Sequence, residues 1–331
     1  MQRGCKKALL LLLVMSLFLL SMLLTGCAQG LAFQGEPGID SAESSVVKQK
    51  LIIAYYITRE GNYLVPVRVK VPDDDNFARH VVEKLLAGSQ DQELLASAFP
   101  VGVVLRDVYV KNGIACVDLG GDVIKTMDPK VWRRAVDSLV LTLTELPDGD
   151  ISSVEILVNG VSDDILLERP AYVNIIAGGP DDGLTTTVYF SYNDTYLVPV
   201  TIKLEPNISD PLFATLEQLV AGPQGIPYLS RVFAEGTRFL GYQKEGDLIR
   251  LNFSREAVEL DTKGNIRKDE QSPTILALAM TLHGFSGLDR FQILIEGQPL
   301  PDLNYPIGIP QSYLDREWIE PLLDIPGAQP T

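Results

Sequence analysis

Apolar and polar residues alternate along several stretches of this chain and follow a helical spacing along others. Residues 51–58 and 64–71 are rich in residues that favour β-strands, and the polar turn between them predicts a hairpin. Apolar residues within 77–86 recur every three or four positions, which predicts a helix with one buried face. A second strand pair turning at Asn112-Gly113, a second helix and a last strand follow. The pattern therefore predicts a ββαββαβ unit, an α+β domain whose two helices pack on a sheet.

The pentapeptide YLVPV occurs twice and indicates that this unit is duplicated. It stands at Tyr63–Val67 and again at Tyr196–Val200. Leu-Leu-Ala-Gly at 85–88 recurs in step as Leu-Val-Ala-Gly at 219–222, and further turn motifs also recur in order. Repetition of motifs in one order predicts two tandem copies of one domain.

The two copies cover residues 51–160 and 185–297, and the composition changes outside them. Residues 28–50 are rich in Gly, Ser, Glu and Gln, which predicts a flexible tether. Residues 161–184 contain Gly-Gly-Pro and are interpreted as a linker. The proline-rich residues 298–331 are expected to form an extended strap over the second domain. Four apolar residues of this strap are candidate contacts to that domain or to a partner: Trp318, Ile319, Leu322 and Leu323.

The first residues have the order of charge and hydropathy that is typical of bacterial signal sequences. Basic residues precede a largely apolar run at 8–24, and the run ends in Leu24-Thr25-Gly26-Cys27. This ending resembles a bacterial lipobox and identifies residues 1–27 as a lipoprotein signal peptide. The resemblance implies a lipid on the sulfur of Cys27, removal of residues 1–26, and a chain held at the extracytoplasmic face of the cell membrane. An uncleaved transmembrane anchor is the alternative, and it also leaves the rest of the chain outside the cytoplasm.

Proline and tyrosine occupy equivalent positions in the first hairpin of both copies. Pro66 and Pro199 lie inside predicted strands. Because proline cannot donate a ladder hydrogen bond, each is expected on an edge strand or at a bulge. Tyrosines on these hairpins are either cross-strand packing residues or interface residues that combine a large contact area with a polar tip. The candidate interface residues are Tyr56, Tyr63, Tyr189 and Tyr196.

Net charge and cysteine content narrow the range of partners and folds. The formal net charge is −15, which disfavours nucleic acid and anionic lipid as partners because their phosphates would be repelled. The three cysteines, Cys5, Cys27 and Cys116, offer no internal pair for a disulfide framework. Cys116 lies in an alternating run and is expected to be a buried core thiol.

The sequence contains no recognisable catalytic constellation. His80 and His283 do not occupy equivalent positions, and no nucleophile elbow, zinc motif or P-loop occurs. Asp73-Asp74-Asp75 precedes the first helix and is interpreted as its cap, with a calcium site as the alternative. The second copy has only Asp210 at that place. We therefore expect no catalytic residue, no metal and no cofactor.

The order of these features resembles the GerM domain in both copies. The resemblance rests on the tyrosine-rich strand, the helix ending at 85–88, the turn Phe99-Pro100-x-Gly102, the glycine-containing hairpin and the final strand. The second copy departs from the turn motif, since Ala234 replaces the proline. Tandem copies behind a lipobox are similar to sporulation and spore-germination lipoproteins of endospore-forming bacteria. The resemblance implies a ring-building type of domain, with self-association or protein partners in an envelope channel complex.

Two functional interpretations follow from this resemblance and from the lack of a catalytic constellation. The first is a non-enzymatic, membrane-anchored assembly protein of the cell envelope, acting in sporulation or spore germination. The alternative is an extracytoplasmic module that binds cell-wall glycan or a small ligand.

Overall fold

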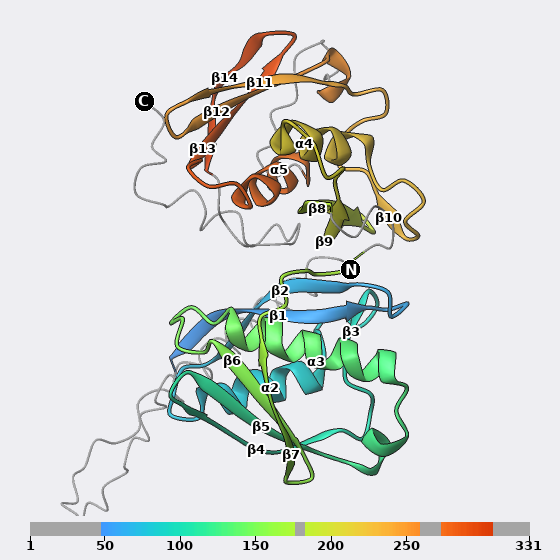
Figure 1. Ribbon diagram of the computed structural model, residues 1–331, viewed down its shortest axis with the longest axis vertical. Coiled ribbons are helices and arrows are strands. Elements are labelled where there is room, and N and C mark those ends of the chain that lie inside the picture. The colour runs from blue at the N-terminus through green and yellow to red at the C-terminus, as the bar shows by residue number, and fades with distance from the viewer. Residues whose placement is uncertain (1–47, 176–182, 259–272, 307–331) are drawn as a thin grey trace, which may run out of the picture. The chain divides into compact units, whose positions relative to one another are not determined.

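A computed structural model describes residues 48–175, 183–258 and 273–306, which include the first predicted copy and the second one apart from residues 259–272 (Figure 1). Each copy has two sheets with two helices between them, and both copies belong to one compact unit of the chain. The fold is therefore the tandem α+β arrangement expected from the sequence. The signal peptide and Cys27 lie outside the described residues, as does the segment 307–331. Among the helices of the described ranges, none has the length and hydropathy needed to cross a membrane.

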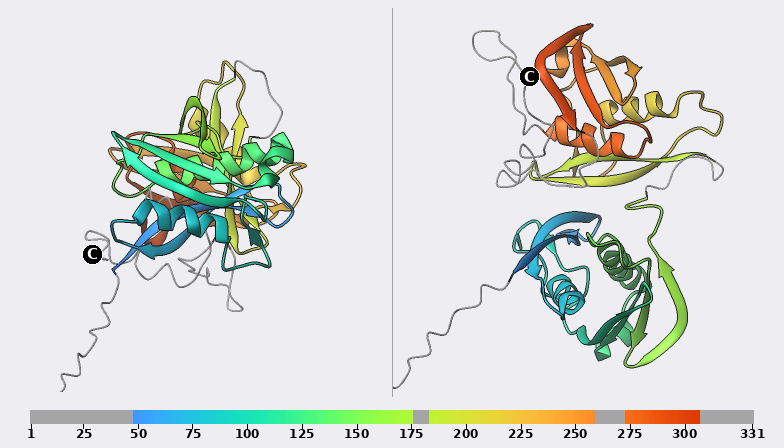
Figure 2. Two further views of the ribbon diagram at one scale, coloured as in Figure 1. Left: turned by 90° about the horizontal axis from the view of Figure 1, so that it is seen from below. Right: turned by 90° about the vertical axis from the view of Figure 1, so that its left-hand side faces the viewer.

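The first copy comprises these elements in chain order: β1 (Gln49–Thr58), β2 (Leu64–Pro72), α2 (Phe77–Ala87), β3 (Leu95–Ala96), β4 (Val104–Lys111), β5 (Ile114–Gly120), a 3-10 turn (Asp122–Thr126), α3 (Pro129–Thr144), β6 (Ser153–Val158) and β7 (Val161–Glu168). The small sheet has the order β2-β1-β3 and the larger sheet the order β4-β5-β6-β7. Figure 2 shows both helices between these two sheets, and Leu85 of α2 and Leu139 of α3 are buried there. Strands β5 and β6 pair in parallel because α3 connects them as a crossover.

The second copy repeats this order: β8 (Thr185–Tyr192), β9 (Tyr196–Lys203), α4 (Pro211–Ala221), β10 (Leu229–Ser230), β11 (Phe239–Glu245), β12 (Leu248–Phe253), a 3-10 turn (Arg255–Ala257), α5 (Pro273–His283), β13 (Arg290–Ile295) and β14 (Gln298–Pro306). Its sheets have the orders β10-β8-β9 and β11-β12-β13-β14, with β12 and β13 parallel. Even single hydrogen bonds recur. The Asp118 side chain accepts from the N–H of Gly160, and the Asn252 side chain accepts from the N–H of Gly297, both at 2.8 Å.

Four strands were not predicted from the sequence pattern: the two-residue strands β3 and β10, and the longer strands β7 and β14. β7 and β14 each fold back on the preceding strand and form an edge of the larger sheet. Part of the predicted linker at 161–184 and part of the predicted strap at 298–331 are therefore sheet strands. Acidic residues in β7 and prolines in β14 weaken the strand signal, but an edge strand tolerates both because one side of it needs no ladder partner.

The two prolines inside the first hairpins lie where their chemistry requires. Pro66 is in β2 opposite Tyr55, and Pro199 is in β9 opposite Tyr189. Both strands are edges of their sheets, so the missing N–H leaves no interior ladder position empty.

Candidate functional site

The four candidate interface tyrosines occupy two different environments. Tyr56 is fully buried in the core of the first copy, where its hydroxyl donates to the carbonyl of Lys84 at 3.3 Å. Tyr189 is half-buried and packs against the core, and burial raises the pKa of its hydroxyl. Tyr63 and Tyr196 are also buried, but each hydroxyl bonds to a residue of the other copy.

The contacts of Tyr63 and Tyr196 are reciprocal. The Tyr63 hydroxyl donates to the carbonyl of Pro227 at 3.0 Å, and the Tyr196 hydroxyl donates to the carboxylate of Asp91 at 2.9 Å. Tyr63 and Tyr196 are the same position of the pentapeptide. Both acceptors lie in the same loop of their copies, between the glycine that ends the helix and the short strand. The two copies therefore contact each other through equivalent surfaces.

Asn174 joins the two pentapeptide strands directly. Its side-chain amide donates to the carbonyls of Leu64 at 2.7 Å and Pro199 at 2.8 Å, and its side-chain oxygen accepts from the N–H of Leu64 at 2.7 Å. The residue lies in the segment predicted to be a linker, and nothing in the sequence marks it. Its φ of +52° lies in the left-handed region, which asparagine tolerates better than most residues.

A third tyrosine of these hairpins, Tyr192, also bonds across the copies. Its hydroxyl donates to the Glu60 carboxylate at 2.8 Å and approaches the Leu94 carbonyl at 3.3 Å. Burial, followed by the hydrogen bond to Glu60, raises the pKa of Tyr192 to about 12. The hydroxyl therefore stays protonated and remains a donor at neutral pH.

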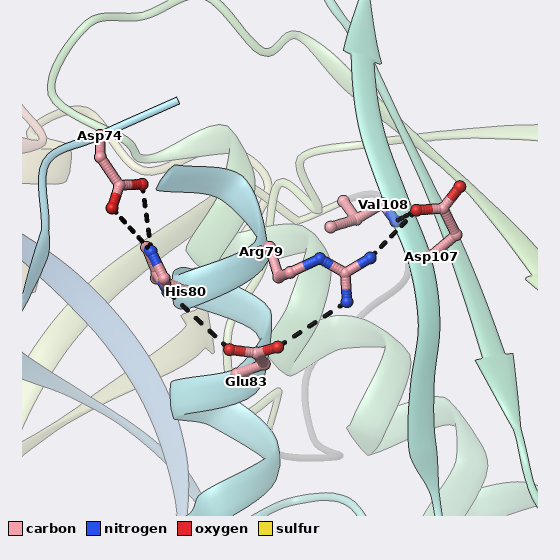
Figure 3. Close-up of polar contacts among 6 residues, drawn as sticks. All are labelled: Asp74, Arg79, His80, Glu83, Asp107 and Val108. Carbon is pink, nitrogen blue, oxygen red and sulfur yellow. Dashed lines mark hydrogen bonds and ion pairs between the residues drawn. The ribbon is translucent and has the colours of Figure 1, made fainter. Parts of the chain in front are cut away.

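A charged network covers the start of α2 (Figure 3). The His80 ring nitrogen Nε2 lies 3.1 Å from the Asp74 carboxylate, and Nδ1 lies 3.8 Å from Glu83. Arg79 lies 3.7 Å from Glu83 and 3.0 Å from Asp107 of β4. These side chains are partly exposed, and such surface pairs contribute only about 0–1 kcal/mol each.

The prediction that Asp73 to Asp75 cap the first helix is wrong. The residue before α2 is Asn76, and its side chain makes no capping hydrogen bond. Asp74 instead accepts from the N–H of Asn76 at 2.8 Å and faces His80. No group of three metal-ligating side chains in the described ranges is arranged to hold a metal ion, Asp73 to Asp75 included.

A groove of about 760 Å³ lies between α3 and the β6–β7 hairpin of the first copy. Its lining is mainly apolar and includes Trp132, Val136, Ile156, Val161, Ile165 and Leu167. Val161 is 71% exposed and Ile165 is 53% exposed. Arg133 and Asp137 pair at 2.9 Å on its rim. Large exposed apolar side chains gathered beside a groove are typical of an interaction surface.

Cys116 is buried, and its environment does not activate the thiol. Its sulfur lies 3.4 Å from Glu155, which also accepts from the Ser162 hydroxyl at 2.6 Å. Burial raises the pKa of the Cys116 thiol, so it stays protonated at neutral pH. At the equivalent place in the second copy, Arg250 donates to Gln292 at 3.1 Å. The duplicated position therefore does not repeat a nucleophile.

Comparisons with known proteins agree on one family. The model of a family described as "Germane: Sporulation and spore germination" matches residues 53–164 and 187–301. The spore germination protein GerM of Bacillus subtilis is 25% identical over 239 residues, which is 65% of this chain. The matched region spans 63% of the length of that relative.

A solved structure has the same fold. It is described as the tandem GerMN domains of the sporulation protein GerM from Bacillus subtilis, and it matches with a TM-score of 0.57 at 20% identity. The match covers 76% of this chain and 92% of that one.

Proposed function

Because this chain belongs to the Germane family of sporulation and spore-germination proteins, we propose that it is a non-enzymatic assembly component of the cell envelope in spore formation or germination. The observation that supports this role best is the reciprocal pairing of Tyr63 and Tyr196, since it means that the domain docks on another domain of its own kind. A domain with that property suits a ring or channel complex built from similar modules. The unactivated Cys116 thiol, with no counterpart in the second copy, also favours a structural role over catalysis.

The second part of the proposal is attachment to the membrane through a lipid on Cys27. The lipobox sequence supports it, and lipidation supplies the two acyl chains that stable anchoring requires. The folded copies would then stand at the extracytoplasmic face, where protein partners or further copies of this chain could assemble with them.

Replacing Cys27 tests the attachment. We expect Cys27→Ala to abolish acylation by a labelled palmitate analogue and to remove the mature, processed chain. Cys5→Ala is the matched control, because it removes a cysteine from the same signal segment without altering the lipobox. Acylation and processing that survive Cys27→Ala would contradict the lipid anchor.

The role in spores is tested separately by deleting the gene in its host. A normal yield of spores with normal germination would contradict the sporulation role, whatever the outcome for Cys27. A defect that the intact gene restores and the Cys27→Ala gene does not would support both parts together.

A ligand-binding module is the second candidate, and one observation favours it. A pocket of about 370 Å³ is lined by polar side chains that include Glu145, Arg169 and Tyr55. Arg169 pairs with Glu145 at 3.2 Å and points toward the Tyr55 hydroxyl at 3.4 Å. Binding of purified peptidoglycan fragments, and its loss in Arg169→Ala, would favour this candidate. No binding at millimolar fragment concentrations would eliminate it.

A further inference from the structure

The polar pocket of about 370 Å³ is built from equivalent positions of both copies. Tyr55 and Tyr189 line it, and each lies opposite the proline of its pentapeptide strand. Thr144 and His283 line it as the last residues of the equivalent helices α3 and α5. The volume falls in the range that small-molecule sites occupy, about 300–1,000 Å³.

The ion pair of this pocket comes from the first copy alone. Glu145 follows α3, and Arg169 follows β7. Gly284 follows α5 in the second copy, so that copy has no equivalent of Glu145. Much of the remaining lining is apolar and comprises Pro170, Ala171, Val173, Pro199 and Met280. The pocket therefore combines one carboxylate and one guanidinium with a surface that suits an aliphatic group.

The contacts of these two charged groups are longer than is usual for such groups. Arg169 Nη1 lies 3.2 Å from Glu145 Oε2. The other contacts of Arg169, to the Leu141 carbonyl and the Tyr55 hydroxyl, are both 3.4 Å. Hydrogen bonds between ions are usually about 2.7–2.9 Å long. Glu145 Oε2 is buried and accepts no hydrogen bond of good geometry from the residues that the structure describes. Both groups therefore retain hydrogen-bonding capacity for a ligand.

The proximity of the two opposite charges limits the charge that a ligand can carry. A ligand with one charge would be repelled by one member of the pair while the other attracts it, and the two effects oppose each other. A molecule with an ammonium and a carboxylate can lie antiparallel to the pair, with its ammonium on Glu145 and its carboxylate on Arg169. Each of the four charges then has a neighbour of opposite sign on either side.

We propose that this pocket binds a free α-amino acid with an apolar side chain. The ammonium and the carboxylate of an α-amino acid are attached to one carbon atom, and this short separation matches the 3.2 Å between Glu145 and Arg169. The side chain then contacts the apolar lining, which includes Val173 and Met280. The inference rests on the ligand-binding candidate function, names its ligand class, and is independent of the assembly role.

Binding of amino acids to the purified full-length chain tests the site, with alanine, valine, leucine and phenylalanine as the probes. At millimolar concentration, at least one of them is expected to raise the melting temperature, because a ligand that binds only the folded state stabilises it. Two analogues of the tightest binder then test the charges by calorimetry. The 2-hydroxy acid lacks the ammonium and the amide lacks the carboxylate. Each is expected to bind at least about tenfold more weakly, since a hydrogen bond between charged groups is lost.

Two variants assign each charge of the ligand to one residue. In Glu145→Gln the 2-hydroxy acid is expected to bind as well as the amino acid, and in Arg169→Gln the amide is expected to do so. A general loosening of the pocket would instead weaken all three ligands alike. Asp137→Asn and Arg133→Gln are the matched controls, because these residues form an ion pair at 2.9 Å on α3 and lie outside the pocket. Both controls should keep the preference for the amino acid.

Three results would overturn the proposal. The first is that none of the four amino acids binds. The second is that the 2-hydroxy acid and the amide bind the natural chain as tightly as the amino acid. The third is that Glu145→Gln and Arg169→Gln keep the full preference for the amino acid. Peptidoglycan fragments that bind where amino acids do not would preserve the ligand-binding candidate and assign the pocket to an uncharged ligand. Normal spores after gene deletion would bear on the assembly role alone.

Discussion

Gly222 shows how one residue fixes a helix boundary in this fold. It follows α4 with a φ of +79°, and a Cβ there would lie 2.9 Å from the Cβ of Arg231. Gly225 has a similar φ of +71° but has open space around it. We expect Gly222→Ala to lower the free energy of unfolding by about 2–3 kcal/mol and Gly225→Ala by about 1 kcal/mol, because only the first adds a steric clash to the backbone strain. Urea denaturation monitored by circular dichroism measures both, and equal losses would contradict the steric argument.

Single residues were predictable from the sequence where their role is local. The glycine after each first helix and the Asn112-Gly113 turn have positive φ, as their motifs suggest. The acceptors of the two pentapeptide tyrosines, Pro227 and Asp91, belong to no motif. Their role depends on which distant segments meet in three dimensions, and no local pattern contains that information.

Helices α2 and α4 are equivalent elements that begin differently. Asp210 caps α4 by accepting from the N–H of Phe213 at 2.9 Å, and it also accepts from the Tyr242 hydroxyl at 3.0 Å. Asn76, the residue before α2, makes no such side-chain bond. We expect Asp210→Ala to cost about 1–2 kcal/mol of stability and Asn76→Ala less than about 0.5 kcal/mol. Thermal unfolding of both variants measures these losses. A large loss of stability from Asn76→Ala would contradict this difference, because it would mean that Asn76 caps α2 as Asp210 caps α4.

Elements with a regular spacing of apolar residues were predictable from the sequence, and strands at sheet edges such as β7 were not. The first hairpins and the first helices appear close to their predicted places. The acidic Asp163 and Asp164 interrupt the apolar pattern of β7, so the sequence pattern predicts a linker there. In the structure, Asp164 has a φ of +58°, which breaks the regular alternation of the strand. The parallel pairing of β5 with β6 also escaped prediction, since strand partners across a helical crossover are set by tertiary packing.

At the scale of the whole molecule, the contact between the copies is expected to weaken as the pH rises through the alkaline range. Tyr192 has a pKa of about 12 in the folded chain against 10 in an unfolded one. Burial of the hydroxyl, followed by its bond to Glu60, raises this pKa, so the protonated hydroxyl contributes stability that is fully present below pH 10 and is lost as the pH rises from 10 toward 12. We expect the difference in melting temperature between the natural chain and Tyr192→Phe to be largest below pH 10 and to shrink above it. Tyr172→Phe, at a 44% exposed side chain, is the control. A difference that is constant from pH 8 to pH 12 would contradict this assignment.

The reciprocal tyrosine contacts have a consequence for how association depends on protein level. Two separate single-copy chains would meet at a rate set by their abundance, and at low expression most would stay apart. Fusion of two copies in one polypeptide makes the same encounter intramolecular, at an effective concentration in the millimolar range for a short connection. Docking of one copy on the other is thus insensitive to gene dosage, and a cell that makes few of these molecules obtains the same paired unit as a cell that makes many.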